Sequence, residues 1–153
     1  MKKNTHLLEP DFFYHIYNRG INGGQIFFSD YNSSYFLKLL KEKVSLVADF
    51  YSYCLLSNHF HILVRIKSEE KIRENFADKD DVEISKIISQ QFSNAFNSYT
   101  QAINKHFGRT GKLFELPFRR KLIVSEEYLI KAILYIHHNP KKHFRAHKIN
   151  SYL

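Results

Sequence analysis

The sequence predicts an α+β domain with a ferredoxin-like sandwich, in which helices flank a central, largely antiparallel sheet. Stretches rich in aromatic and β-branched residues alternate with stretches whose apolar residues recur at helical spacing. Two strand-like stretches lie close enough together to form a hairpin. The resulting order of strand, helix, strand, strand, helix, strand and helix is that of a split βαβ arrangement. The length of 153 residues predicts a single domain over 1–153.

The first half of the chain is expected to contain three strands and one helix. The aromatic run at residues 12–18 predicts a strand that enters a glycine-rich loop. Ser29 can cap a helix that extends to about Val47, because the apolar residues behind it recur at helical spacing. The apolar runs at 50–56 and 60–66 form the expected hairpin.

The second half is expected to contain two helices and one strand. Residues 67–83 are charged and poor in apolar side chains, which predicts a mobile surface loop without chemistry. Helical spacing then predicts a long helix over 82–107 that stops at a glycine. A strand is expected at 118–124, after which Ser125 caps a helix that Asn139-Pro140 closes.

The excess positive charge lies in the last third of the chain. Residues 1–100 carry 12 Lys or Arg against 12 Asp or Glu, whereas residues 101–153 carry 11 against 3. Basic residues interleaved with aromatic ones suit the phosphates and unpaired bases of a nucleic acid. A solvated basic face is the alternative explanation and has about equal weight on charge alone.

The absence of membrane and export signals and the cysteine content exclude several classes of protein. The chain shows no signal peptide and no apolar run long enough for a bilayer, so we expect a cytoplasmic protein that does not contact membranes. Its single cysteine, Cys54, excludes an internal disulfide and a cysteine-rich zinc site. Cys54 stands in an apolar run and is expected in the core.

Two histidines in the third expected strand are candidate metal ligands. His59 and His61 are two residues apart, so their imidazoles project from one face of the strand while Phe60 points to the other. Two imidazoles on a rigid face can bind a divalent cation if a further group completes the site. The alternative is that they simply pair with neighbours on a solvated sheet face.

The end of the last expected helix contains a second group of polar residues. Tyr135 and Asn139 are four residues apart, so their side chains share a helix face and could meet one centre. His138 lies three residues from Tyr135 and can share that edge. The alternative is an ordinary core tyrosine followed by a plain helix terminus.

The two groups together resemble a known family. The run His59-Phe60-His61, followed by Tyr-Ile-His-x-Asn-Pro at 135–140, resembles the single-tyrosine HUH transposases and in particular the REP-associated tyrosine transposases. The resemblance covers residues 12–140, although the family's usual Asn-Pro-Val-Arg-Ala-Gly ending is replaced here after Pro140. Further segments similar to the family's, in its order, are 14–20, 26–27, 108–114 and 128–129.

The resemblance implies a role for each candidate. His59 and His61 would bind Mg²⁺ or Mn²⁺, and Asn139 would be the third protein ligand. Tyr135 would be the nucleophile that cuts and rejoins single-stranded DNA through a 5′-phosphotyrosine. The resemblance names no general base, and His138 is a candidate assistant because of its place near Tyr135. The family's substrates imply a hairpin-containing DNA partner, and because the family includes monomers and homodimers the oligomeric state stays open.

Basic residues near the last expected strand are candidate DNA contacts, and a solubilising role is the alternative for each. They are Arg19, Lys112, Arg119, Arg120 and Lys121.

Three other functions remain open: a domesticated, non-mobilising DNA-binding or nicking protein of the same fold, a replication or conjugation initiator, and an RNA-binding module.

Overall fold

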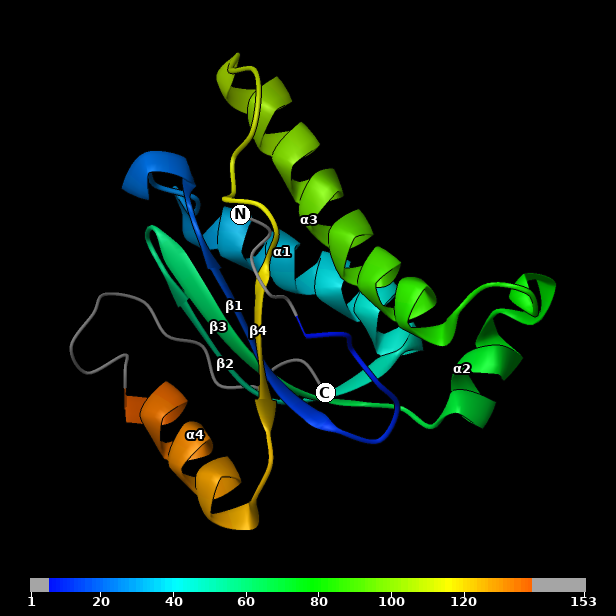
Figure 1. Ribbon diagram of the computed structural model, residues 1–153. Coiled ribbons are helices and arrows are strands. Elements are labelled where there is room, and N and C mark those ends of the chain that lie inside the picture. The colour runs from blue at the N-terminus through cyan, green and yellow to red at the C-terminus, as the bar shows by residue number, and fades with distance from the viewer. Residues whose placement is uncertain (1–5, 139–153) are drawn as a thin grey trace.

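The computed structural model describes residues 6–138 and is built on a four-stranded sheet (Figure 1). The strands follow the spatial order β2-β3-β1-β4, and every neighbouring pair is antiparallel. Since β3 lies between β1 and β2, which a helix connects, the arrangement is a split βαβ and confirms the ferredoxin-like α+β sandwich. The strands are β1 (Phe13–Arg19), β2 (Ala48–Leu56), β3 (His59–Ile66) and β4 (Arg119–Ile123).

The helices are divided between the two faces of the sheet. Figure 1 shows α1 and α3 side by side on one face and α4 on the other, where it packs against β2 and β3. No helix within residues 6–138 is long and apolar enough to cross a membrane. The helices are α1 (Asp30–Lys43), α2 (Glu69–Asn75), α3 (Ile84–Phe107) and α4 (Glu126–His138), with 3₁₀ turns η1 (Ile21–Gly23), η2 (Val44–Leu46) and η3 (Ala77–Lys79).

Local signals place the helix ends. The Ser29 hydroxyl accepts the backbone N–H of Asn32 at 3.2 Å, and the Ser125 hydroxyl accepts that of Tyr128 at 3.1 Å. Gly108 ends α3 with a φ of 62°, a left-handed conformation that costs glycine little. These three predicted boundaries are confirmed.

The expected loop at 67–83 is wrong, because this segment contains α2 and η3. The Ser68 hydroxyl caps α2 by accepting the Lys71 N–H at 3.2 Å, and Ile72 is fully buried. Arg73 donates to the carbonyls of Lys79 and Val82, both at 2.8 Å, and so ties the turn to the helix. One buried apolar residue gives too little periodicity for the helix to be recognised in a charged segment.

Each face of the sheet has its own core. The α1 and α3 face is rich in aromatic rings, with Phe36, Phe60 and Phe96 in mutual contact. The α4 face has a smaller apolar cluster that includes Cys54, which is fully buried as predicted, and burial raises the pKa of its thiol to about 11. The buried members of this second cluster are Cys54, Leu56, Leu63, Ile123, Ala132 and Ile136.

Candidate active site

Strand register brings polar residues together on the face of the sheet that α4 covers only in part. His61 on β3 is paired with Tyr17 on β1, and Tyr17 is paired in turn with Arg119 on β4. The next row pairs His59 with Arg19. Residues paired directly across antiparallel strands point to the same face. Helix α4 packs on the apolar part of this face. The polar residues named above share the face and form a site beside the helix.

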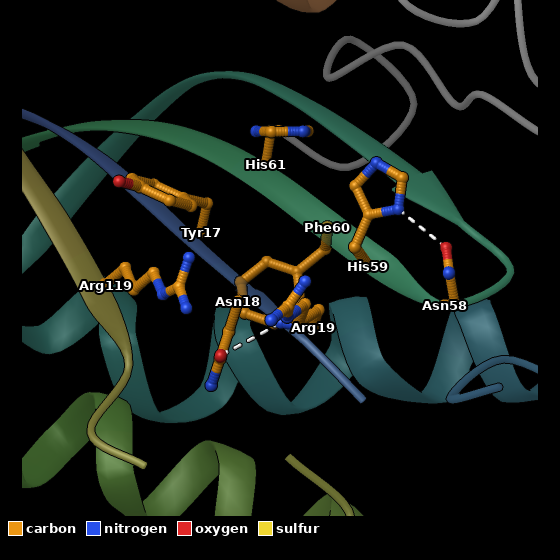
Figure 2. Close-up of a pocket in the computed structure, with 8 residues that line it drawn as sticks. All are labelled: Tyr17, Asn18, Arg19, Asn58, His59, Phe60, His61 and Arg119. Carbon is orange, nitrogen blue, oxygen red and sulfur yellow. Dashed lines mark hydrogen bonds between the residues drawn. The ribbon is translucent and has the colours of Figure 1, made fainter. Parts of the chain in front are cut away.

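These residues line a pocket of about 270 Å³ (Figure 2). It unites four of the predicted site residues, His59, His61, Arg19 and Arg119, which come from three strands. Figure 2 shows the two histidines rising from β3 while Asn18 and Phe60 point toward the helices below the sheet. The full lining is Tyr17, Asn18, Arg19, Asn58, His59, Phe60, His61 and Arg119.

Both histidines are held by hydrogen bonds through the same ring nitrogen. His59 donates from Nδ1 to the Asn58 amide oxygen at 2.7 Å, and Nδ1 of His61 shares a hydrogen bond of 2.9 Å with Nε2 of His15. The centroids of the two predicted ligand rings are 5.3 Å apart, with an interplanar angle of 89°. An imidazole oriented through Nδ1 coordinates metal through Nε2, so both rings suit a cation site.

His15 is a member of this site that the sequence did not single out. Its ring centroid lies 5.0 Å from that of His61 and 4.8 Å from that of Tyr17. Burial, and secondarily the charge of Lys121, lower the pKa of His15 to about 4. The available signal was its position in β1, two residues before Tyr17 and therefore on the same face, but only the register shows which histidine it meets.

Tyr135, the predicted nucleophile, lies at the edge of the histidine group. Its ring centroid is 5.8 Å from that of His61, at an interplanar angle of 88°. Tyr135 is 57% exposed, while the following residue of α4, Ile136, is fully buried in the cluster between the helix and the sheet. The phenol therefore belongs to the open part of the face and not to the core.

Asn139, the expected third ligand, and the side chain of the candidate assistant His138 lie outside the described residues. Within residues 6–138, no group of three or more His, Cys, Asp or Glu has the geometry to hold a metal ion. The expected ligand set contains only two residues of these types, His59 and His61, together with the amide of Asn139, so a group of three is not expected.

Two of the predicted basic residues converge on one carboxylate. Arg19 Nε lies 2.9 Å from one carboxylate oxygen of Glu115, and Arg119 donates to the other oxygen at 3.2 Å. Lys121 stands on the same strand face as Arg119, and a hydrogen bond to Tyr128 raises the pKa of its ammonium group. Glu115 was missed by the sequence analysis because it lies outside every expected helix and strand.

The structure places the other two predicted DNA contacts elsewhere. Arg120 points to the opposite face of β4, where its guanidinium carbon lies 3.9 Å from the Phe118 ring centroid and its Nη1 donates to Ser89 at 3.3 Å. Burial lowers the pKa of Arg120. Lys112 lines a separate pocket of about 500 Å³ between α3 and the following loop. Neither residue lines the pocket that contains the histidines.

The fold and the site together define a ferredoxin-like α+β protein with a histidine-lined pocket on the open face of its sheet. No protein-family model and no curated protein sequence matches the chain. Among solved structures, it is similar to that of a REP-associated tyrosine transposase bound to a REP hairpin, with a TM-score of 0.64 and 14% sequence identity. The similarity covers 93% of this chain and 74% of that chain. At this identity the two proteins share a fold, which agrees with the resemblance noted in the sequence.

Proposed function

We propose that this protein is a metal-dependent tyrosine transposase that cuts and rejoins single-stranded DNA through Tyr135. The observation that carries the proposal is the position of the Tyr135 ring, 5.8 Å from that of His61, on the sheet face that also presents His59. The fold-sharing protein was solved with a DNA hairpin, which supports a hairpin-bearing strand as the substrate.

The proposed reaction is a transesterification at phosphorus. The Tyr135 oxygen bonds to the phosphorus of a phosphodiester and the bond to the 3′ oxygen breaks, so the products are a 5′-phosphotyrosine and a free 3′-hydroxyl. The phenol loses its proton and the departing oxygen gains one. Because one phosphodiester replaces another, a second 3′-hydroxyl can attack the adduct and rejoin the strands. The phenol needs its proton removed or its anion stabilised to be an effective nucleophile.

The chain's own residues would hold the cation and the reacting groups. His59 and His61 would supply imidazole nitrogens and Asn139 an amide oxygen, a donor set compatible with octahedral Mg²⁺ or Mn²⁺ that also binds water and phosphate. When bound, the cation would polarise the scissile phosphate. Asn58 and His15 keep the two imidazoles oriented, so the ligands are arranged before the substrate arrives.

The test is formation of a covalent adduct. A labelled single strand carrying an imperfect hairpin, incubated with Mn²⁺, should give a denaturant-resistant protein–DNA product that Tyr135→Phe abolishes. Tyr31→Phe is the matched control, because Tyr31 is 79% exposed on α1, on the opposite face of the sheet. An undiminished adduct in Tyr135→Phe would show that Tyr135 is not the nucleophile. Tight DNA binding without any adduct would favour the domesticated, non-mobilising alternative.

A further inference from the structure

Arg19 and Arg119 form a pair that the proposed chemistry does not use. They come from β1 and β4, yet they contact separate oxygens of the same Glu115 carboxylate, at 2.9 Å and 3.2 Å. Both line the pocket that contains His59 and His61 (Figure 2). The side chains of Arg19 and Arg119 are 56% and 39% exposed, whereas that of Glu115 is 22% exposed. The carboxylate therefore lies beneath two cations that face solvent.

We propose that Arg19 and Arg119 form a clamp for one phosphodiester group of single-stranded DNA, and that Glu115 is the positioning residue that holds both guanidinium groups at the pocket. The proposal rests on the proposed function for the identity of its ligand. The phosphate in the clamp is not the one that Tyr135 attacks but a neighbour on the same strand, because the arginines occupy the part of the pocket formed by β1 and β4.

Glu115 is anchored through its backbone. Its N–H donates to the Arg19 carbonyl at 3.0 Å, and its carbonyl accepts from the Asn18 amide at 2.7 Å. Asn18 is only 3% exposed, and its amide oxygen accepts the Arg19 N–H at 2.9 Å. The carboxylate consequently has a fixed position relative to the end of β1. Its ion pairs in turn hold the two guanidinium groups at the pocket.

The donors and charges match one phosphodiester. A guanidinium has five N–H donors in a planar fork, and each arginine directs one of them to Glu115. The remaining donors can reach a phosphate, whose tetrahedral oxygens suit two forks. Two guanidinium groups and one carboxylate carry a net charge of +1, which balances the single negative charge of a phosphodiester.

Oligothymidylate binding to the Tyr135→Phe protein, which cannot form an adduct, tests the clamp. Arg19→Gln and Arg119→Gln should each weaken binding about tenfold, the usual effect of losing a charge-assisted hydrogen bond. Arg65→Gln is the matched control: Arg65 is exposed on β3, lies 4.0 Å from a carboxylate oxygen of Asp11, and is outside the pocket. Its substitution should change affinity less than about twofold.

The salt dependence separates a clamp from two independent contacts. Each phosphate neutralised on a single strand contributes about 0.7 to the slope of log Kd against log salt. If both arginines hold one phosphate, the double substitution should lower the slope by about 0.7, no more than either single substitution does. A double substitution that lowers it by about 1.4, with additive losses of affinity, would overturn the clamp.

Glu115→Ala tests the positioning role. Loss of a positioning residue should weaken DNA binding, whereas loss of an anion that merely competes with the phosphate should strengthen it. We expect about threefold weaker DNA binding although a negative charge is removed, and Glu115→Gln, which keeps one carbonyl acceptor, should fall in between. Glu42→Ala is the charge-matched control on α1, where Glu42 lies 3.9 Å from Lys38. Tighter binding by Glu115→Ala, in protein with an unchanged melting temperature, would overturn the positioning role.

The two proposals fail in different ways. If the Tyr135→Phe protein does not bind single-stranded DNA at all, the proposed function and the clamp are both wrong. If it binds, and the unsubstituted protein forms the covalent adduct, but Arg19→Gln and Arg119→Gln bind as well as Arg65→Gln, only the clamp is wrong.

Discussion

The Nε2 atom of His15 lies 2.9 Å from the Nδ1 atom of His61. This contact joins β1 to β3 and gives one predicted metal ligand a partner on the neighbouring strand. A second contact, between Asn58 in the turn before β3 and His59, gives the other ligand a partner next to it in the chain. The cation site that we propose would thus include two imidazoles whose orientation is fixed by neighbouring side chains.

His15→Ala should weaken Mn²⁺ binding about 10- to 100-fold, because loss of an orienting partner has an effect of this size at other metal sites. Titration of the DNA-free protein with Mn²⁺, followed by electron paramagnetic resonance, measures this affinity without reference to activity. His106→Ala is the control, since His106 is exposed at the end of α3. An unchanged Mn²⁺ affinity in folded His15→Ala protein would contradict the orienting role.

Removal of metal should abolish the covalent adduct and leave the fold intact. The sheet is held by backbone pairing and its two cores by apolar side chains, and neither depends on the histidine side chains, so a chelator is expected to change the melting temperature little. Adduct formation should return on addition of Mn²⁺. A cooperative loss of secondary structure in chelator, measured by circular dichroism, would instead indicate a structural metal site.

The protein should lose stability in alkali. Burial raises the pKa of Cys54 from 9.0 to about 11, and it also raises the pKa of Tyr99, whose hydroxyl donates to the Ile26 carbonyl at 2.5 Å. When the folded pKa is above the unfolded one, the stabilisation is complete below the unfolded value and is lost as pH rises toward the folded value. Urea unfolding midpoints should therefore fall between about pH 9 and 11. Cys54→Ala should reduce this fall. If the midpoints of Cys54→Ala and of the unsubstituted protein changed identically with pH, Cys54 would not contribute to the loss of stability.

Ile136→Ala should loosen α4 and with it the position of Tyr135. Ile136 is fully buried in the cluster that contains Cys54, and its truncation should cost about 2–5 kcal/mol. The Cys54 thiol then becomes accessible by local opening, so its labelling rate with a disulfide reagent at pH 8 should rise and adduct formation should slow. Leu134→Ala, at a 50% exposed position on the same helix, is the control. Equal labelling rates in the two variants would contradict this role for α4.

Several features follow from short-range patterns in the chain. The period of a strand places His59 and His61 on one face, and the capping residues and Gly108 mark where three helix boundaries fall, since these effects depend on neighbours within a few positions. The α+β sandwich follows from the order of the elements. The segment at 67–83 was mistaken for a loop because the short helix α2 has a single buried residue, Ile72.

The composition of the pocket depends instead on which strands are neighbours and in which register. Nothing local to β1 indicates that His15 meets His61, or that Arg19 shares the Glu115 carboxylate with Arg119 about a hundred positions later. Such contacts arise only after the strands pair in the order β2-β3-β1-β4 and α4 covers the apolar half of one face. Pairing register is set by burial of the whole sheet, so it is a property of all four strands together and of no single stretch of sequence.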